Sequence, residues 1–572
     1  MKLFNLSNRG NRCSVPANVR ALQLLVWLVV ALMLPNIVLA FTEGYNGWSV
    51  AAGIILPLGL YLLTPLFTRR VSFVALVLLP VLALCAVQLV LLYLYGNSII
   101  AVDMYTNIMT TNSVESSELL RGMTPVIIGV ALLYVPLLYA VLRQIIDSRY
   151  SLSGSVRRGF VMAGALLTIV GIQLLYPASR VSNSDVVIAE IFPLNAINNL
   201  RIALHNRWAV ERYAETSAEY RHEAERAVFT SKREVYIYII GESSRACSWS
   251  LYGYQRITNP RLSAREDICL FKNVITQSNT THKSVPLMLS GVDIKTYEEL
   301  FRRKGLASLF NEAGFHSYFI STQSPQGAMV DNLAAECDDI VYVSAPSHDM
   351  ELLRVVKRVV EANDSDNILF ILHCSGSHYC YNQRYTEEFA IFQPDNDSAV
   401  DPRNIEALRN AYDNSILYTD HILSSFVEYL DSLDACTAML YCSDHGEGLF
   451  DDERGVFLHA SPMVTYYQLH VPCLAWFSQE YCDSHPDKVT MARQHRWSPA
   501  TTGAMFHTMA DIASIRGNSV DFRRSLVNVA FDESAPRLYL NDKNEAVKLN
   551  HRMGITNLDH REFLSRGVTI DD

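Results

Sequence analysis

Three strand-like segments of the chain, EVYIYIIGESSR, NILFILHCSGSH and ACTAMLYCSDHGEG, each end in side chains that can bind a metal. These side chains, together with one histidine from the later segment GVFLHASP, are Glu242, His373, His378, Asp444, His445 and His459. Two carboxylates with two or more imidazoles form a ligand set suited to Zn²⁺. The combination predicts a metal site, although any one of these residues alone could be a loop carboxylate, a turn residue or a surface histidine.

A second cluster, NVITQSNTTHKSVPLMLSG from Asn273 to Gly291, combines hydroxyls with a histidine and a lysine and then runs into a proline and an apolar stretch. A solvent-exposed loop has this composition. So does the mouth of a catalytic site in which a hydroxyl nucleophile lies where a helix begins, since a helix N-terminus favours an anion. The residues of this segment alone leave both interpretations open.

The elements that must position these clusters alternate between strand-like and helix-like patterns, which is typical of α/β proteins. In an open, mainly parallel sheet, ligands bind beyond the carboxyl ends of the strands. Three such ends, each carrying Glu, His or Asp–His, therefore indicate a single constellation at one edge of the sheet.

The long apolar runs all lie in the first third of the chain, which has 572 residues and is 50% hydrophobic overall. A helix needs about 20 predominantly apolar residues to cross a bilayer. Five runs are long enough, and we predict membrane spans at residues 20–41, 47–67, 71–95, 122–143 and 159–177.

The charges that flank these runs predict their orientation, because cytoplasmic loops carry an excess of Lys and Arg. Arginines precede the first run and lie between the second and third and between the fourth and fifth, at Arg9, Arg12, Arg20, Arg69, Arg70, Arg143, Arg149, Arg157 and Arg158. The connection at 42–46 and most of 96–120 carry acids and few bases. We therefore expect a cytoplasmic N-terminus, with everything after about residue 178 outside, which in a double-membrane bacterium is the periplasm. A cleaved signal peptide ending near VLAF is the alternative, but its apolar stretch is long for one.

The predicted organisation is a membrane domain at 1–177, a linker with an amphipathic helix at 178–230 and a catalytic domain at 231–572. The linker helix could instead lie on the membrane surface. The net charge of −10 argues against a nucleic-acid partner, which needs a basic face. Of 11 cysteines, Cys13 and Cys85 lie in the tail and the membrane, and the other nine lie where disulfides can form. Nine is odd, so at least one is free or pairs between chains.

The segments GESSRACSWSLYGYQRITNPRL, NVITQSNTTHKSVPLMLS, GSH, SDHGEGL and GVFLHASP occur in the order and approximate spacing of the phosphoethanolamine transferases. These are membrane enzymes of the alkaline phosphatase superfamily that modify lipid A and related glycans. The resemblance covers nearly the whole chain. It implies five membrane helices in the bacterial inner membrane, followed by a periplasmic α/β domain of the sulfatase type, in which helices sandwich a mainly parallel sheet.

The resemblance also assigns roles to residues. It makes Thr281 the nucleophile, and the residues that would complete a zinc site with it are Glu242, Asp444 and His445. His378 and His459 would serve the substrate phosphate or a second zinc ion. Because Thr280 adjoins Thr281, the assignment of the nucleophile could be wrong by one residue.

The implied reaction is a double displacement. Binding to Zn²⁺ would lower the pKa of the threonine hydroxyl, which is otherwise a poor nucleophile. Thr281 would attack phosphatidylethanolamine, release diacylglycerol and pass phosphoethanolamine to lipid A or another surface glycan. In the segment DMYTNIMTTNSVESSELL, the residues Asn107, Thr111 and Glu115 would approach the lipid headgroup, unless the segment is only a polar loop that caps two helices. A monomer is the default expectation.

The chain departs from the family pattern beside the nucleophile. A disulfide often flanks the nucleophile in that family, but the matching positions here are Gln277 and Leu287. His282 and Lys283 are equally consistent with phosphate binding and with exposed side chains.

Three rival functions remain. A phosphoglycerol transferase shares the five spans, the metal site and the threonine, and only the detailed motifs and the match at Glu115 argue against it. A sulfatase needs Cys or Ser followed by x-Pro-x-Arg, and the string SVPLM from Ser284 lacks the arginine. An inactive scaffold should have lost at least one of the site residues.

Overall fold

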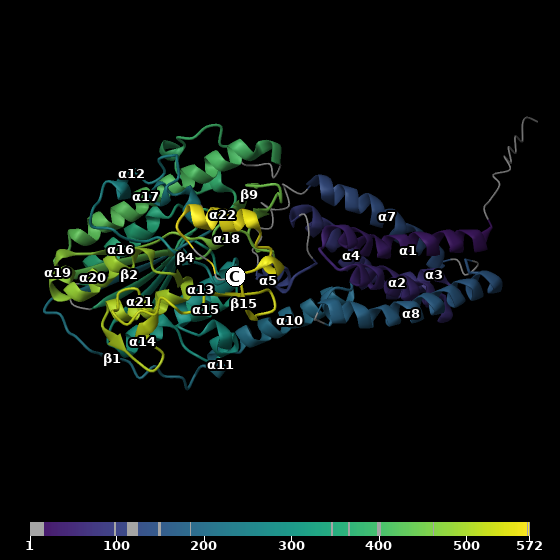
Figure 1. Cartoon of the computed structure of the whole chain (residues 1–572), viewed down its shortest axis with the longest axis horizontal. Coiled ribbons are helices and arrows are strands. Elements are labelled where there is room, and N and C mark those ends of the chain that lie inside the picture. The colour runs from purple at the N-terminus through teal and green to yellow at the C-terminus, as the bar shows by residue number, and fades with distance from the viewer. Residues whose placement is uncertain are drawn as a thin grey trace, which may run out of the picture. The chain divides into compact units, whose positions relative to one another are not determined.

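A computed structural model of the protein describes residues 16–95, 99–110, 124–146, 150–182, 185–344, 347–363, 367–396, 402–460, 463–568 and 570. The chain divides into two compact units (Figure 1), one of residues 1–100 and 123–198 and one of residues 101–122 and 199–572. The segment that begins at residue 101 thus belongs with the second unit, although apolar helices flank it in the sequence. The predicted boundaries at 177 and 230 stay a prediction.

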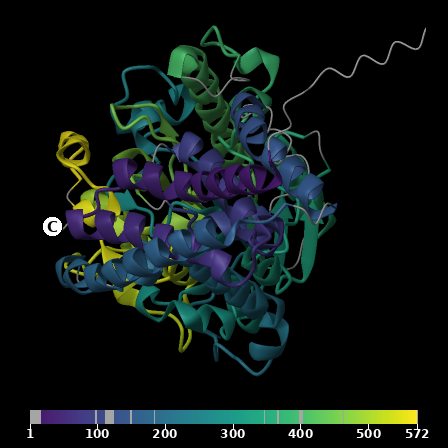
Figure 2. The ribbon, with the colours of Figure 1, turned by 90° about the vertical axis from the view of Figure 1, so that its right-hand side faces the viewer.

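The first unit consists of helices that lie side by side (Figure 2). They are α1 (Ala17–Thr42), α2 (Gly47–Leu63), α3 (Val71–Val77), α4 (Leu79–Tyr95), α7 (Thr124–Ile146), α8 (Gly154–Ser182) and α9 (Val186–Ala189). Among the described residues, four helices are long and apolar enough to cross a membrane, and a fifth span results if α3 and α4 count as one. The predicted helical region of five apolar runs is therefore confirmed.

The third predicted span is broken rather than straight. Helices α3 and α4 meet at an angle of 64° across Leu78. Pro80 occupies the second position of α4. Proline has no backbone N–H, and its ring clashes with the carbonyl four residues earlier, so an α-helix cannot continue undisturbed through it.

Glycines bring α2 and α8 into close contact. A Cβ atom on Gly164 would lie 2.8 Å from backbone atoms of Leu62 and Leu63, and one on Gly59 would lie 2.6 Å from the backbone nitrogen of Thr168. Small residues allow apolar helices to approach closely where no hydrophobic effect drives them together. A larger side chain at either glycine would force the two helices apart.

The second unit has the alternating strands and helices that the sequence predicts. The strands of its seven-stranded sheet are β2 (Glu234–Gly241), β3 (Cys269–Phe271), β5 (His316–Ser321), β6 (Asp339–Tyr342), β7 (Ile368–His373), β8 (Cys436–Ser443) and β11 (Cys473–Phe477). The shorter strands are β1 (Glu225–Arg226), β4 (Val274–Ile275), β9 (Gly448–Leu449), β10 (Phe457–Leu458), β12 (Ala500–Thr501), β13 (Ile515–Arg516), β14 (Leu538–Leu540) and β15 (Ala546–Lys548). The remaining helices are α5 (Val102–Thr110), α10 (Leu194–Glu211), α11 (Tyr213–Thr216), α12 (Pro260–Ser263), α13 (Thr281–Ser290), α14 (Leu306–Glu312), α15 (Met329–Ala334), α16 (Met350–Ala362), α17 (Ile405–Asp431), α18 (Tyr466–Leu469), α19 (Gln479–Ser484), α20 (Pro486–Gln494), α21 (Met505–Ile512) and α22 (Asn557–Ser565).

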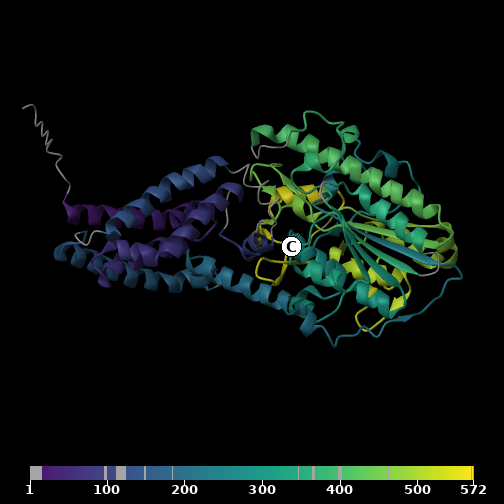
Figure 3. The same ribbon diagram turned by 180° about the vertical axis from the view of Figure 1, so that it is seen from behind.

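The strands of the central sheet lie side by side (Figure 3), and their order is β3-β11-β8-β2-β7-β5-β6. Strand β2 pairs in parallel with β7 and β8, whereas β11 runs antiparallel to both of its neighbours. Alternate residues of β2 enter two different cores, one shared with α13, α14 and α21 and the other with α16 and α17. Helices therefore cover both faces, which explains why β2 reads as a continuous apolar run. The predicted α/β fold is confirmed.

The register of the three central strands brings their carboxyl ends to one edge. Ile240 of β2 lies opposite both His373 of β7 and Cys442 of β8. The chain then leaves each strand within one or two residues, so the segments that follow β2, β7 and β8 start side by side. This edge is where the sequence predicts the metal ligands.

Disulfides are absent from the described part of the chain, in which ten cysteines are free. Nine of these are buried, and only Cys482 is half-buried. The second unit is therefore held together by its hydrophobic cores rather than by cross-links.

A buried neutral histidine makes the stability of the second unit sensitive to pH. His470 is 1% exposed; its Nε2–H donates to the carbonyl of Lys272 at 2.9 Å, and its Nδ1 accepts from the Tyr466 hydroxyl at 3.0 Å. Burial lowers its pKa from 6.5 to about 4. The unfolded chain takes up this proton first, so stability falls as the pH drops below 6.5 toward 4.

We expect this histidine to lower the free energy of unfolding of the wild type by about 2 kcal/mol as the pH falls from about 7 to about 5. His470→Gln removes the titrating group and puts a neutral amide, which can also donate and accept hydrogen bonds, in its place. Thermal unfolding of the two proteins at both pH values should show a smaller acid-induced loss for the variant. An equal loss in both proteins would assign the acid sensitivity to other groups.

Candidate metal centre and nucleophile

The predicted site residues occupy loops at the carboxyl edge of the sheet. Glu242 directly follows β2, and Asp444 and His445 directly follow β8. His378 lies five residues beyond the end of β7, and His459 directly follows β10. Glu242, Asp444 and His445 thus directly follow two neighbouring strands of the central sheet, whereas His459 follows a strand of the separate sheet of β9 and β10.

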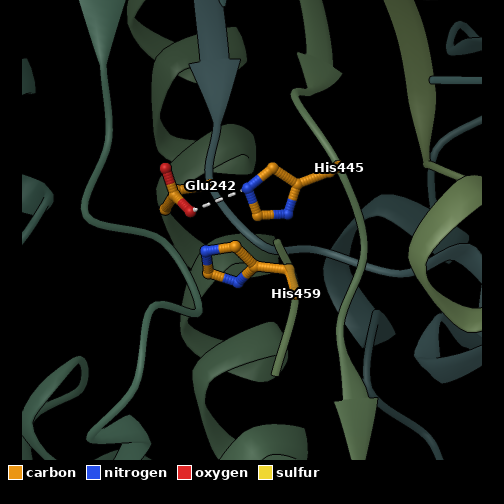
Figure 4. Close-up of side chains that lie close together, drawn as sticks. All are labelled: Glu242, His445 and His459. Carbon is orange, nitrogen blue, oxygen red and sulfur yellow. Dashed lines mark ion pairs between the residues drawn. The ribbon is translucent and has the colours of Figure 1, made fainter. Parts of the chain in front are cut away.

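The side chains of Glu242, His445 and His459 point toward one another (Figure 4), and one donor atom of each lies within 4.8 Å of the others. Nε2 of His445 is 3.6 Å from Oε1 of Glu242 and 3.2 Å from Oδ2 of Asp444. The side chains of Glu242, Asp444 and His445 have no exposed surface. Two carboxylates are thus buried together around one imidazole.

The tautomer of His445 aims a lone pair at this cluster. Its Nδ1 lies 2.9 Å from the carbonyl oxygen of Gly446, which can only accept, so Nδ1 carries the proton. Burial, followed by the neighbouring His459, lowers the pKa of His445 to about 4, so the ring is neutral near pH 7. Nε2 therefore presents a lone pair to the carboxylates, as a metal-ligating histidine does.

This arrangement fits a bound cation. In the described part of the chain, Oδ2 of Asp444 has no hydrogen-bond partner. Burial, followed by the neighbouring Glu242 carboxylate, raises the pKa of Asp444 well above its ordinary value. Buried like charges that face a lone pair repel one another, and a divalent cation between them removes that cost. The donor set of two carboxylates, an imidazole and a hydroxyl fits Zn²⁺.

The hydroxyl of Thr281 reaches the same cluster. Its Oγ1 lies 3.3 Å from Oε2 of Glu242 and 3.2 Å from Nε2 of His445. The hydroxyl of Thr280 instead lies 3.1 Å from that of Ser278. Of the two adjacent threonines, Thr281 is therefore the one that faces the carboxylates.

The segment around Thr281 is a helix start and not an exposed loop. Residues 274–280 are buried, and α13 begins at Thr281 and directs the apolar stretch Val285–Leu289 into the core. The first N–H groups of α13 have no partner within the helix, so this end of it favours an anion.

Two further histidines and their neighbours complete the surroundings. The ring of His459 lies 4.1 Å from that of His445 and 6.1 Å from that of His378, measured between centroids. Nδ1 of His378 donates to the carbonyl of Tyr379 at 2.8 Å, which leaves Nε2 as its lone pair. Both rings border the cluster and are half-buried, whereas His445 is fully buried.

Sequence analysis missed two residues that hold the cluster in place. The fully buried Glu447 lies 3.0 Å from Nδ1 of His459 and fixes its ring. Glu447 lies in the segment SDHGEG, so its position near two predicted ligands could have identified it from the sequence. Gln323 donates through Nε2 to Oε2 of Glu242 at 3.1 Å and to the carbonyl of Cys374 at 2.7 Å. No motif marks Gln323, which follows β5.

Hydrogen bonds hold the loop where the family has a disulfide. The backbone N–H of Gln277 donates to the Thr502 hydroxyl at 3.1 Å, and its carbonyl accepts from the N–H of Leu540 at 2.8 Å. Leu287 is fully buried in the core. The loop before α13 is therefore anchored on both sides without a cross-link.

The predicted donor-binding residues are only partly within the described residues. Asn107 lies in α5 and is half-buried, whereas Thr111 and Glu115 lie outside the described residues. Neither His282 nor Lys283 is an exposed side chain, because both contact Asp103 of α5.

Comparisons with known proteins agree with this geometry. Residues 234–515 match the sulfatase family. The phosphoethanolamine transferase EptA of Salmonella typhimurium is 28% identical over 64% of this chain and 69% of its own length. The phosphoethanolamine transferase EptC of Escherichia coli K12 is 27% identical over 52% of this chain and 54% of its own. A relative from the same strain, named as the transferase YhbX, is 31% identical, and the match spans 43% of either chain.

Solved structures show the same fold. The integral membrane phosphoethanolamine transferase EptA of Neisseria meningitidis superposes with a TM-score of 0.69 at 22% identity, covering 88% of this chain and 98% of that one. The zinc complex of the periplasmic domain of Escherichia coli EptC has a TM-score of 0.52 at 24% identity, covering 57% of this chain and 95% of that one. Both the helical region and the α/β domain thus have counterparts among known structures.

Proposed function

From a chain whose residues 234–515 form a sulfatase-family domain, we propose a zinc-dependent transferase that moves phosphoethanolamine from phosphatidylethanolamine to lipid A or another surface glycan. The observation that carries the proposal is the position of Thr281, whose hydroxyl faces Glu242 and His445 at the start of a helix. The relatives named phosphoethanolamine transferases supply the identity of the transferred group.

The zinc ligands in this proposal are Glu242, Thr281, Asp444 and His445. When bound, the zinc ion lowers the pKa of the Thr281 hydroxyl and neutralises charge on the phosphoryl group. The zinc complex of the EptC domain supports this choice of metal. His378 and His459, which border the cluster, bind the substrate phosphate or a second zinc ion.

Transfer proceeds in two displacements. Oγ1 of Thr281 loses its proton and attacks the phosphorus of the donor lipid, and the bond from phosphorus to the diacylglycerol oxygen breaks as that oxygen takes up a proton in exchange. Phosphoethanolamine then rests on Thr281. In the second step a hydroxyl or phosphate oxygen of the acceptor attacks the same phosphorus, and Thr281 is released as a hydroxyl.

The segment between the third and fourth apolar runs supplies the donor-binding residues in this proposal. Asn107, Thr111 and Glu115 contact the headgroup in this proposal, with the Glu115 carboxylate paired to its ammonium. The protein is a monomer of the inner membrane with its catalytic domain in the periplasm. This placement follows from the arginine-rich flanks of the apolar runs.

The rival functions are less well supported. A sulfatase nucleophile at Ser284 is disfavoured because that hydroxyl donates to the carbonyl of Asp444 at 2.6 Å and is fully buried. A phosphoglycerol transferase uses the same zinc chemistry, so it remains the second candidate.

Mass spectrometry of lipid A and core glycan distinguishes these candidates. We expect a host without its own phosphoethanolamine transferases to gain a phosphoethanolamine mass increment when it expresses this chain. A glycerol phosphate increment would instead favour the second candidate. Unchanged glycans, with the protein present in the membrane, would contradict both acceptor assignments.

A further inference from the structure

A buried ion pair joins the helix between the third and fourth apolar runs to the helix that carries Thr281. Nζ of Lys283, in the first turn of α13, lies 2.7 Å from Oδ1 of Asp103 in α5. The two side chains are only 2% and 8% exposed. Both helices belong to the second unit. Either charge alone would be costly to bury there, so each side chain depends on the other.

The ammonium of Lys283 uses all three of its protons inside the protein. Besides Asp103, it donates to the carbonyls of Asn541 at 2.9 Å and Asp542 at 3.2 Å, in the turn between β14 and β15. Nε2 of His282 lies 3.3 Å from the same Asp103 oxygen. Lys283 is therefore engaged in holding α5, and it has no proton left for a phosphate.

Asp103 is ionised in this environment. Burial alone would raise its pKa, but Lys283 and then His282 outweigh burial, so the pKa of Asp103 is lowered. A carboxylate kept charged and buried depends on its partner, and the loss of either member leaves the other uncompensated. The contact between α5 and α13 thus depends on both charges.

The ion pair also lies close to a proposed functional residue on each of the two helices. Asp103 and Asn107 are four residues apart in α5, so they share one face of that helix. Lys283 is two residues beyond Thr281 in α13. At the other end of α5, the carbonyl of Met109 accepts from Arg207 at 3.2 Å. Helix α5 thus contacts α13 near its start and α10 near its end.

We propose that Asp103 and Lys283 are a positioning pair for the lipid donor, which holds α5 beside the nucleophile helix so that Asn107 lies at a fixed distance from Thr281. The inference rests on the proposed function, in which Asn107 contacts the lipid headgroup. Neither Asp103 nor Lys283 touches the reacting atoms. Small misplacements of a bound substrate cost much of the rate, so the pair should govern donor use.

The test compares a lipid donor with a small one in the full-length protein. We expect Asp103→Asn and Lys283→Met to lower kcat/KM for fluorescent phosphatidylethanolamine in nanodiscs by about tenfold or more. Turnover of soluble 4-nitrophenyl phosphoethanolamine should stay within about twofold, because it needs only the metal centre and Thr281. The double variant should lose about as much as either single variant, since the two residues act as one pair. Lys295→Met, at an exposed lysine, is the matched control and should change neither rate.

Hydrogen exchange of the α5 amides tests the same pair without any donor. Exchange in residues 102–110 should become faster in both single variants and stay unchanged in Lys295→Met. Equal losses of activity on both substrates would mean that the pair only supports folding, and would overturn the inference. Unchanged kinetics with the lipid donor would overturn it too. A wild-type protein that hydrolyses the soluble ester but transfers nothing from the lipid contradicts the proposed donor. In that case, faster hydrogen exchange in the two variants would still establish that the ion pair anchors α5. The failure of the proposed donor is therefore distinguishable from the failure of the ion pair's role.

Discussion

Thr281→Ala should reduce phosphoethanolamine transfer by about a thousandfold or more, because it removes the hydroxyl of α13 that faces the proposed metal ligands. The hydroxyl lies 3.3 Å from Glu242 and 3.2 Å from His445, at the helix end that favours an anion. The Thr280 hydroxyl lies against Ser278 and cannot take its place without a change of backbone. We expect the variant to fold, because the Thr281 side chain is only half-buried.

The measurement is transfer from fluorescent phosphatidylethanolamine by purified full-length protein. Thr281→Ser keeps a hydroxyl and should retain part of the rate, whereas Thr280→Ser is the matched control and should retain nearly all of it. Without an acceptor, the wild-type peptide that contains Thr281 should gain the mass of phosphoethanolamine. An active Thr281→Ala together with an inactive Thr280→Ala would move the nucleophile by one residue.

The sheet was predictable because its central strands are buried on both faces. β2, β7 and β8 appear in the sequence as short apolar runs, and the rule for the carboxyl ends of parallel strands then groups the residues that follow them. The apolar helices were equally clear from length and composition. The break at Leu78 was not predicted, although Pro80 two residues later is a sufficient local cause.

Contacts between distant segments were beyond the reach of sequence patterns. Gln323 meets Glu242 across 81 residues, and Asp103 lies 179 residues before His282. A periodicity of two or 3.6 residues reports which face of an element is buried, but not which polar side chain of another element lies opposite. The grouping of α5 with the catalytic unit therefore appeared only in the structure.

Glu242→Ala should abolish both metal binding and transfer. Three of the four proposed ligands would remain, but the metal would lose a carboxylate whose two oxygens lie 3.3 Å from the Thr281 hydroxyl and 3.6 Å from Nε2 of His445. We expect the zinc content measured by mass spectrometry to fall well below that of the wild type, and the transfer rate to fall by about a thousandfold or more.

The effect of zinc on thermal stability tests the same ligand without any substrate. Burial would raise the pKa of Glu242, but the neighbouring histidines outweigh burial and lower it to about 2, so the carboxylate is ionised near pH 7 and can bind a cation. Zinc should therefore raise the Tm of the wild type, as any ligand of the native state does, and leave the Tm of Glu242→Ala unchanged. Glu447→Gln is the matched control: it alters a carboxylate that orients His459 without removing a proposed ligand, so most of the zinc-dependent rise should survive. If Glu242→Ala kept the full rise in Tm, the metal would have to bind elsewhere. A loss of the rise in Glu447→Gln but not in Glu242→Ala would place it on the His459 side of the cluster.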